Sequence, residues 1–112
     1  MIEKIILDYL NTELNVPCYM EIPEEKPNSF VIIQKTGSGV ENFIYSSIFA
    51  FQSYAQSLFE AATLNEAVKL AMDNAPAELA SVSRSKLNSD YNFTDTTTKE
   101  YRYQAVYDIV HY

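Results

Sequence analysis

The chain has 112 residues, of which 47% are hydrophobic and 21% charged, so we expect residues 1–112 to fold as a single domain with one modest core. Its formal net charge is −7, from 15 acidic and 8 basic residues, which argues against tight binding to nucleic acids. No apolar run approaches the roughly 18 residues that a membrane-spanning helix requires.

The first predicted element is an amphipathic helix over residues 2–14. Its apolar side chains recur at spacings of three and four residues, at Ile2, Ile5, Ile6, Tyr9, Leu10 and Leu14. Pro17 ends the helix, because the residue before a proline is pushed out of the helical region. Residues 17–22 are then predicted as a short strand, and a loop with two prolines follows.

The next segment predicts two strands joined by a glycine-containing turn. Residues 29–36 are apolar on both faces, which indicates a central position in a sheet. Gly37-Ser38-Gly39 holds the only two glycines of the chain and is predicted to break this strand. Residues 42–54 are predicted as the following strand, with Phe49 and Phe51 on one face. We expect the loop between the strands to extend from Gly37 into the forties.

A second helix is predicted to begin after Ser57 and to run to about Asn74. Ser57 and Glu60 have the spacing of a capping box, in which each residue satisfies one free backbone amide. The helix periodicity predicts five residues that face the core: Leu58, Ala61, Ala62, Val68 and Met72. Leu64 and Ala71 are expected to flank them. Pro76 is expected to stop the helix or to open a short turn.

Two further strands complete the predicted fold. Residues 82–93 are weakly β, residues 95–98 form a turn, and residues 100–112 alternate strictly between two faces. The last two strands are expected to pair as an antiparallel hairpin. The order α-β-β-β-α-β-β predicts an α+β fold of two layers, with a mainly antiparallel sheet of four or five strands and both helices packed on one face.

No residue set in the sequence predicts catalysis. Cys18 is interpreted as a half-buried apolar residue at the start of a strand rather than a nucleophile, and His111 as a strand-end side chain rather than a general base or metal ligand. Glu21, Glu24 and Glu25 form an acidic cluster that we interpret as a solvated loop rather than a cation site. We therefore expect no enzyme activity, no metal and no cofactor.

Aromatic residues are concentrated in the last two strands. Single-stranded nucleic-acid binders combine such a platform with a cationic groove, but the charges of these strands sum to zero. The remaining interpretations are packing within the sheet and contact between subunits. The interface candidates are two glycines and six aromatic residues: Gly37, Gly39, Phe43, Tyr45, Tyr91, Phe93, Tyr101 and Tyr103.

Three stretches carry a family resemblance. They are VPCYMEIPEEKPNSFVII, the strand-to-helix junction QSYAQSLFEAATLNEAV, and the aromatic final strand YRYQAVYDIVHY. In this order and spacing, the chain resembles over nearly its whole length the tail-terminator proteins of long-tailed phages and prophages, which are also called tail-completion or head–tail joining proteins.

The resemblance implies a structural virion protein at the head-proximal end of the tail, made in the host cytoplasm. Such proteins form a homo-oligomeric ring, a hexamer, on the tail-tube protein, stop its polymerisation and offer a surface to the head connector or stopper protein. DNA passes through the lumen without specific binding, and no membrane is involved. The segment from Gly37 to Ile44 is expected to be a mobile loop that orders on docking.

Other functions stay open on the sequence. The chain is also compatible with another head–tail connector component, an adaptor or a stopper, although adaptors are often helical and stoppers often small β-barrels. A small non-catalytic protein-binding module is a further alternative. A small hydrolase or nuclease would have to use the acidic residues, and no His/Asp/Glu constellation supports it.

Overall fold

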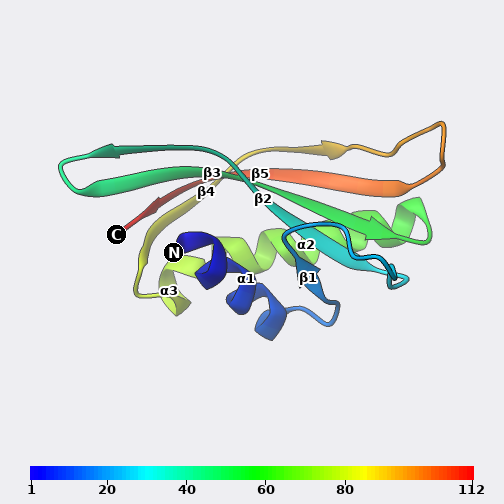
Figure 1. The fold of residues 1–112 in the computed structure, drawn as a ribbon, viewed down its shortest axis with the longest axis horizontal. Coiled ribbons are helices and arrows are strands. Elements are labelled where there is room, and N and C mark those ends of the chain that lie inside the picture. The colour runs from blue at the N-terminus through cyan, green and yellow to red at the C-terminus, as the bar shows by residue number, and fades with distance from the viewer.

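A computed structural model describes residues 1–112 as a sheet with its helices on one side (Figure 1). The elements in chain order are α1 (Ile2–Glu13), β1 (Cys18–Tyr19), β2 (Phe30–Glu41), β3 (Ile44–Ala55), α2 (Leu58–Asp73), α3 (Ala75–Glu78), β4 (Val82–Asn92) and β5 (Tyr101–His111). The strand order is β1-β2-β3-β5-β4, and every neighbouring pair is antiparallel except β1 and β2. The predicted mainly antiparallel α+β fold is thus confirmed, with β1 shorter than expected.

The two longer helices form where the sequence predicts them. In α1, Ile6 and Leu10 are fully buried against the sheet. In α2, the Ser57 hydroxyl accepts a hydrogen bond from the Glu60 amide at 3.1 Å, which confirms the predicted cap. The prediction that Leu58 faces the core is wrong, because its side chain is 41% exposed at the first turn.

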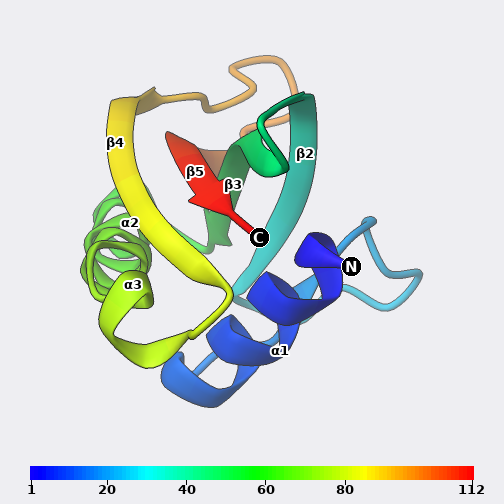
Figure 2. The ribbon, with the colours of Figure 1, turned by 90° about the vertical axis from the view of Figure 1, so that its left-hand side faces the viewer.

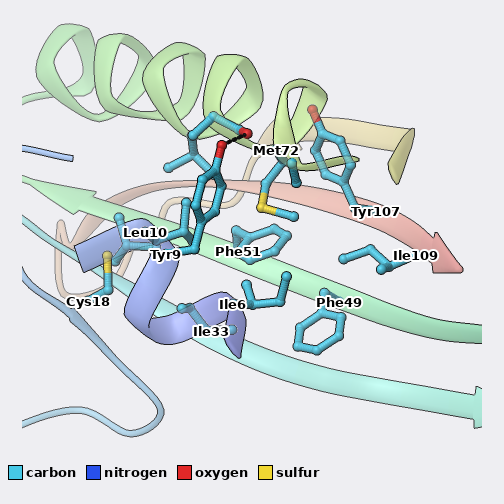
Figure 3. Packing of buried hydrophobic residues seen from close by; sticks show 14 of the residues in the cluster. Ile6, Tyr9, Leu10, Cys18, Ile33, Phe49, Phe51, Met72, Tyr107 and Ile109 are labelled. Atoms are coloured by element: carbon cyan, nitrogen blue, oxygen red, sulfur yellow. Dashed lines mark hydrogen bonds between the residues drawn. The ribbon is translucent and has the colours of Figure 1, made fainter. Parts of the chain in front are cut away.

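The main core lies between the sheet and the helices (Figure 3). Phe49 and Phe51 project from β3 on the helix side, and Tyr107 from β5 meets Phe51 edge-on with ring centroids 5.9 Å apart. The hydroxyl of Tyr9 donates to the carbonyl of Ala71 at 2.7 Å, which joins α1 to α2. Each of these large side chains contributes about 1.5–3 kcal/mol of hydrophobic free energy when fully buried.

The predicted glycine turn is wrong. β2 continues through Gly37 and Gly39 to Glu41, and the only irregularity is a register shift between Lys35 and Gly37. Neither glycine has a positive φ. Glycine inside a strand is typical of such a bulge, which admits one extra residue without ending the pairing. The loop predicted from Gly37 to Ile44 is therefore a paired β-ribbon.

The second hairpin follows the prediction closely. β4 and β5 pair in antiparallel register from Val82 opposite His111 to Asn92 opposite Tyr103. In the connection, the Asp95 carboxylate accepts a hydrogen bond from the Thr97 amide at 2.9 Å, which forms the expected turn.

The molecule is elongated, with principal extents of 45 × 24 × 24 Å. The turn between β2 and β3 lies at one end of the long axis, beyond the helices, and the β4–β5 connection lies at the other end (Figure 1). The view along the long axis shows α1 and α2 below the same side of the sheet, while β2 and β4 rise at its two flanks (Figure 2). The structure therefore presents two distinct ends.

Candidate functional site

The connection between β2 and β3 contains only Asn42 and Phe43, and both have positive φ, 54° and 66°. A two-residue hairpin turn with positive φ at both positions is the type I′ turn, whose preferred sequence is Asn-Gly. Asn42 fits this preference, but Phe43 occupies the position that favours glycine. For a residue with a bulky side chain, the left-handed conformation costs about 1–2 kcal/mol.

The same Phe43 side chain is 90% exposed to solvent. Phe43 lies at the end of the hairpin, which we call the hairpin tip; its other exposed apolar residues are Val40 and Tyr45, which are paired on one face, and Ile44, which lies on the other face. A strained backbone and an exposed aromatic ring at one position both oppose stability. Such violations of folding preferences are concentrated at functional sites, where another constraint maintains them.

The hairpin tip is anchored to the body of the sheet just below the turn. Tyr45 stacks on the ring of His111 with centroids 5.6 Å apart, and His111 Nε2 lies 2.8 Å from the Ser47 hydroxyl. Burial of the imidazole lowers the pKa of His111 and the charge of Lys35 acts in the same direction, whereas a hydrogen bond with the backbone of Tyr112 and the carboxylate of Glu3 act in the opposite direction. His111 therefore serves as a neutral, buried support at the end of β5, in agreement with the strand-end interpretation.

The predicted interface residues divide into two groups at opposite ends of the sheet. Gly37, Gly39, Phe43 and Tyr45 lie on the β2–β3 hairpin, whereas Tyr91, Phe93, Tyr101 and Tyr103 lie around the β4–β5 connection. The second group is itself split between the two faces of the sheet. Tyr91 is paired with Gln104 and shares its face, whereas Tyr103 is the neighbour of Gln104 along β5 and lies on the other face. These aromatic rings therefore do not form one continuous stacking platform.

The face of the sheet opposite the helices carries a polar and aromatic network that sequence reasoning missed. Arg102 donates to the Tyr54 hydroxyl at 2.9 Å, and its guanidinium lies 4.6 Å from the centre of the Phe93 ring. Gln52 donates to Gln104 at 2.8 Å, across the β3–β5 pair. The only sequence signal for this network was the alternation of β5, which places Arg102 and Gln104 on one face.

A pocket of about 330 Å³ lies at the end of the sheet that is far from the hairpin tip; we call it the far-end pocket. The rings of Phe30 and Tyr54 are stacked there with centroids 4.6 Å apart, and both residues are buried. Lys26 lines the same pocket and forms an ion pair with Glu100 at 3.1 Å. The pocket joins three segments that are distant in sequence, so no local pattern could have revealed it.

Cys18 and the acidic residues that follow it are the reactive groups that the sequence singles out. Cys18 lies at the start of β1, as expected, but is buried rather than half-buried, and burial raises the pKa of its thiol to about 12. Glu21, Glu24 and Glu25 are exposed in the loop before β2. No group of three or more His, Cys, Asp or Glu side chains is positioned to hold a metal ion.

The best-connected polar cluster joins α2 to β4. Lys69 donates to Asp90 at 2.9 Å and pairs with Glu66, and the Asn65 amide nitrogen donates to the same Asp90 carboxylate at 3.0 Å. These carboxylate contacts raise the pKa of Lys69, so its ammonium group stays charged. Asn65 is 1% exposed and lies on the buried face of α2, at a position where an apolar residue is typical. The cluster lines none of the larger pockets, and its chemistry is that of a structural tie between helix and sheet.

Comparison with known proteins adds no assignment. The sequence matches no known family model, and a search of curated proteins finds no significant relative. None of the helices combines the length and apolar character needed to cross a membrane.

Proposed function

We propose that this protein is a structural, non-catalytic assembly protein of the tail-terminator type. It caps the phage tail tube as a hexameric ring, ends tail polymerisation and joins the tail to the head connector. The resemblance of the sequence to tail terminators supplies the identity of the machine. The observation that carries the assembly role is Phe43, a strained and 90% exposed aromatic residue at a hairpin turn.

Phe43 supports assembly because a partner that covers its exposed ring can offset the cost of its left-handed backbone. An exposed phenyl ring gains hydrophobic free energy when a partner covers it, at about 25 cal/mol for each Å² of apolar surface buried. Aromatic residues are correspondingly enriched in the buried centres of protein interfaces. A free-standing protein would be more stable with glycine at this turn.

The charge of the chain supports passage of DNA without binding. A net charge of −7 on each subunit gives the assembled ring a strongly negative total charge. A lumen of the same sign as the phosphate backbone repels DNA and lets it slide.

One alternative within the same machine is a head-side connector component. Helix accounts for 29% of the residues and strand for 45%, which is unlike a predominantly helical adaptor. The open sheet with a helix layer also differs from the closed β-barrel expected of a stopper. The terminator remains the function that the geometry supports best.

The test uses tail tubes polymerised from the purified tail-tube protein of the same phage or prophage. Purified protein is added during polymerisation, and tube length and end density are measured by negative-stain electron microscopy. The wild type should give short tubes with a ring on one end, whereas Phe43→Asp should leave tubes uncapped. Phe59→Asp is the matched control, because Phe59 is 81% exposed on α2 but has ordinary helical backbone. Uncapped tubes with folded wild-type protein would refute the terminator function.

A further inference from the structure

We propose that the hairpin tip of one copy inserts Phe43 into the far-end pocket of a second copy. This head-to-tail contact would be the seam of the ring, so it rests on the proposed function above. The two surfaces lie at opposite ends of a 45 Å molecule and cannot meet within one chain. Any contact between them is therefore a contact between two copies.

The far-end pocket has the size and chemistry to hold a phenyl ring. Its volume of about 330 Å³ exceeds that of a protein cavity of about 150 Å³ that binds benzene. The stacked Phe30 and Tyr54 rings provide an aromatic lining, and Tyr101 adds a further ring at the start of β5. Because Phe30 and Tyr54 are each 3% exposed, they present little free ring surface, and most of the contact with an inserted ring would come from the other lining residues, such as Tyr101.

Charges at the two ends are complementary. Glu41 precedes the turn at the hairpin tip and has no ion-pair partner within the chain. Lys99 lines the far-end pocket, is exposed and likewise forms no ion pair. Insertion of Phe43 would bring Glu41 to the pocket rim, where Lys99 could neutralise it.

Pairing between the sheet edges of two copies is the alternative seam, and irregularities in the edge strands disfavour it. β2, which β1 covers only at Val31 and Ile32, has a register shift in its pairing with β3 between Lys35 and Gly37, and β4 has two in its pairing with β5, between Val82 and Arg84 and between Leu87 and Ser89. Bulges and basic side chains are the devices that protect edge strands from pairing with another chain. A contact between different surfaces is heterologous, and such contacts close into rings when the rotation between copies permits.

One such contact is small. An aromatic side chain buries about 150–250 Å², well below the 1,200 Å² or so of a stable protein interface. Two isolated copies should therefore associate weakly, while each subunit of a closed ring makes the contact twice. Assembly should accordingly be cooperative and be promoted by the tail tube, which holds the subunits close together.

Disulfide trapping between separate chains tests the seam directly. Ile44→Cys places a thiol beside Phe43 at the hairpin tip, and Thr98→Cys places one at the rim of the far-end pocket. Cys18 is buried and does not compete. The two variants mixed under oxidation at millimolar concentration should give a heterodimer, whereas either variant alone should give little. A homodimer of Ile44→Cys alone, or no heterodimer in the mixture, would overturn the proposal.

A charge reversal provides a second test that does not rely on trapping. Glu41→Lys should weaken self-association about two- to fivefold, the range of a single exposed ion pair, and Lys99→Glu should do the same. The combined variant should restore wild-type association. Additive weakening in the combined variant would show that Glu41 and Lys99 do not meet.

Failure of the seam and failure of the terminator function have different signatures. Tubes that are capped normally by a protein that forms no tip-to-pocket disulfide would refute the seam alone. A heterodimer from the cysteine pair together with uncapped tubes would support the seam and refute the terminator function.

Discussion

Replacing Phe43 with glycine should make the monomer more stable while it abolishes assembly. The left-handed conformation costs a side-chain-bearing residue about 1–2 kcal/mol, and glycine removes that cost. Glycine also gives the unfolded chain more conformational freedom, which offsets about 0.5–1 kcal/mol of this gain in stability. Little buried surface is lost, because the ring is 90% exposed. The net gain is about 0.5–1 kcal/mol, which corresponds to a rise in Tm of roughly 2–4 °C.

Thermal unfolding followed by circular dichroism measures this effect at a concentration where the wild type is monomeric. Phe59→Gly is the matched control, since it also removes an exposed phenyl ring but places glycine inside α2. That substitution should not raise Tm, because Phe59 has ordinary helical backbone at the second position of α2 and glycine relieves no strain there. A Tm for Phe43→Gly that is equal to or below the wild-type value would refute the claim that this turn is strained.

The remaining predictions concern the body of the fold. Ser57→Ala should lower the free energy of unfolding by about 1 kcal/mol through loss of the cap, whereas Thr63→Ala should be nearly neutral; equal effects in a urea titration would contradict this. Tyr107→Phe removes the hydroxyl whose single proton is shared between the Lys69 carbonyl and the Asp73 carboxylate of α2, and should lower the free energy of unfolding by about 1–3 kcal/mol; an unchanged denaturation midpoint would count against that role. The Cys18 thiol should react with a maleimide only after unfolding, and rapid labelling of the native protein would show that it is accessible. The pKa of His111 is lowered from 6.5 by burial, so the unfolded chain takes up a proton first as the pH falls. The stability that His111 contributes is complete above pH 6.5 and is lost below it. His111→Asn should therefore make Tm fall less as the pH drops below 6.5, and a pH profile of Tm identical to that of the wild type would refute the assignment.

Much of the fold could be predicted because its signals are local. The apolar spacing of α1, the Ser57–Glu60 cap and the alternation of β5 each depend on residues within one element. The first hairpin was harder, because its two glycines mark a bulge while the turn itself lies at Asn42 and Phe43. Glycine is preferred at such a turn but not required, and nothing local indicates that a phenylalanine will occupy it.

The features that matter for the proposed site depend on tertiary structure. Asn65 is buried on α2 because Asp90, which is distant in sequence, offers it a hydrogen-bond acceptor. The far-end pocket likewise exists only because the starts of β2 and β5 and the end of β3 meet at one end of the sheet. Composition alone could nominate aromatic interface residues, but it could not divide them between two ends of the molecule.

The most direct test of the account is the molar mass of the protein by light scattering over a wide range of concentration, for the wild type and for Phe43→Gly. If Phe43 forms the seam, the molar mass of the wild type should rise cooperatively to a plateau at six subunits, while Phe43→Gly should stay monomeric although it is more stable. A wild type that remains monomeric at millimolar concentration, that stops at a dimer, or that assembles no better than Phe43→Gly would contradict the central claim.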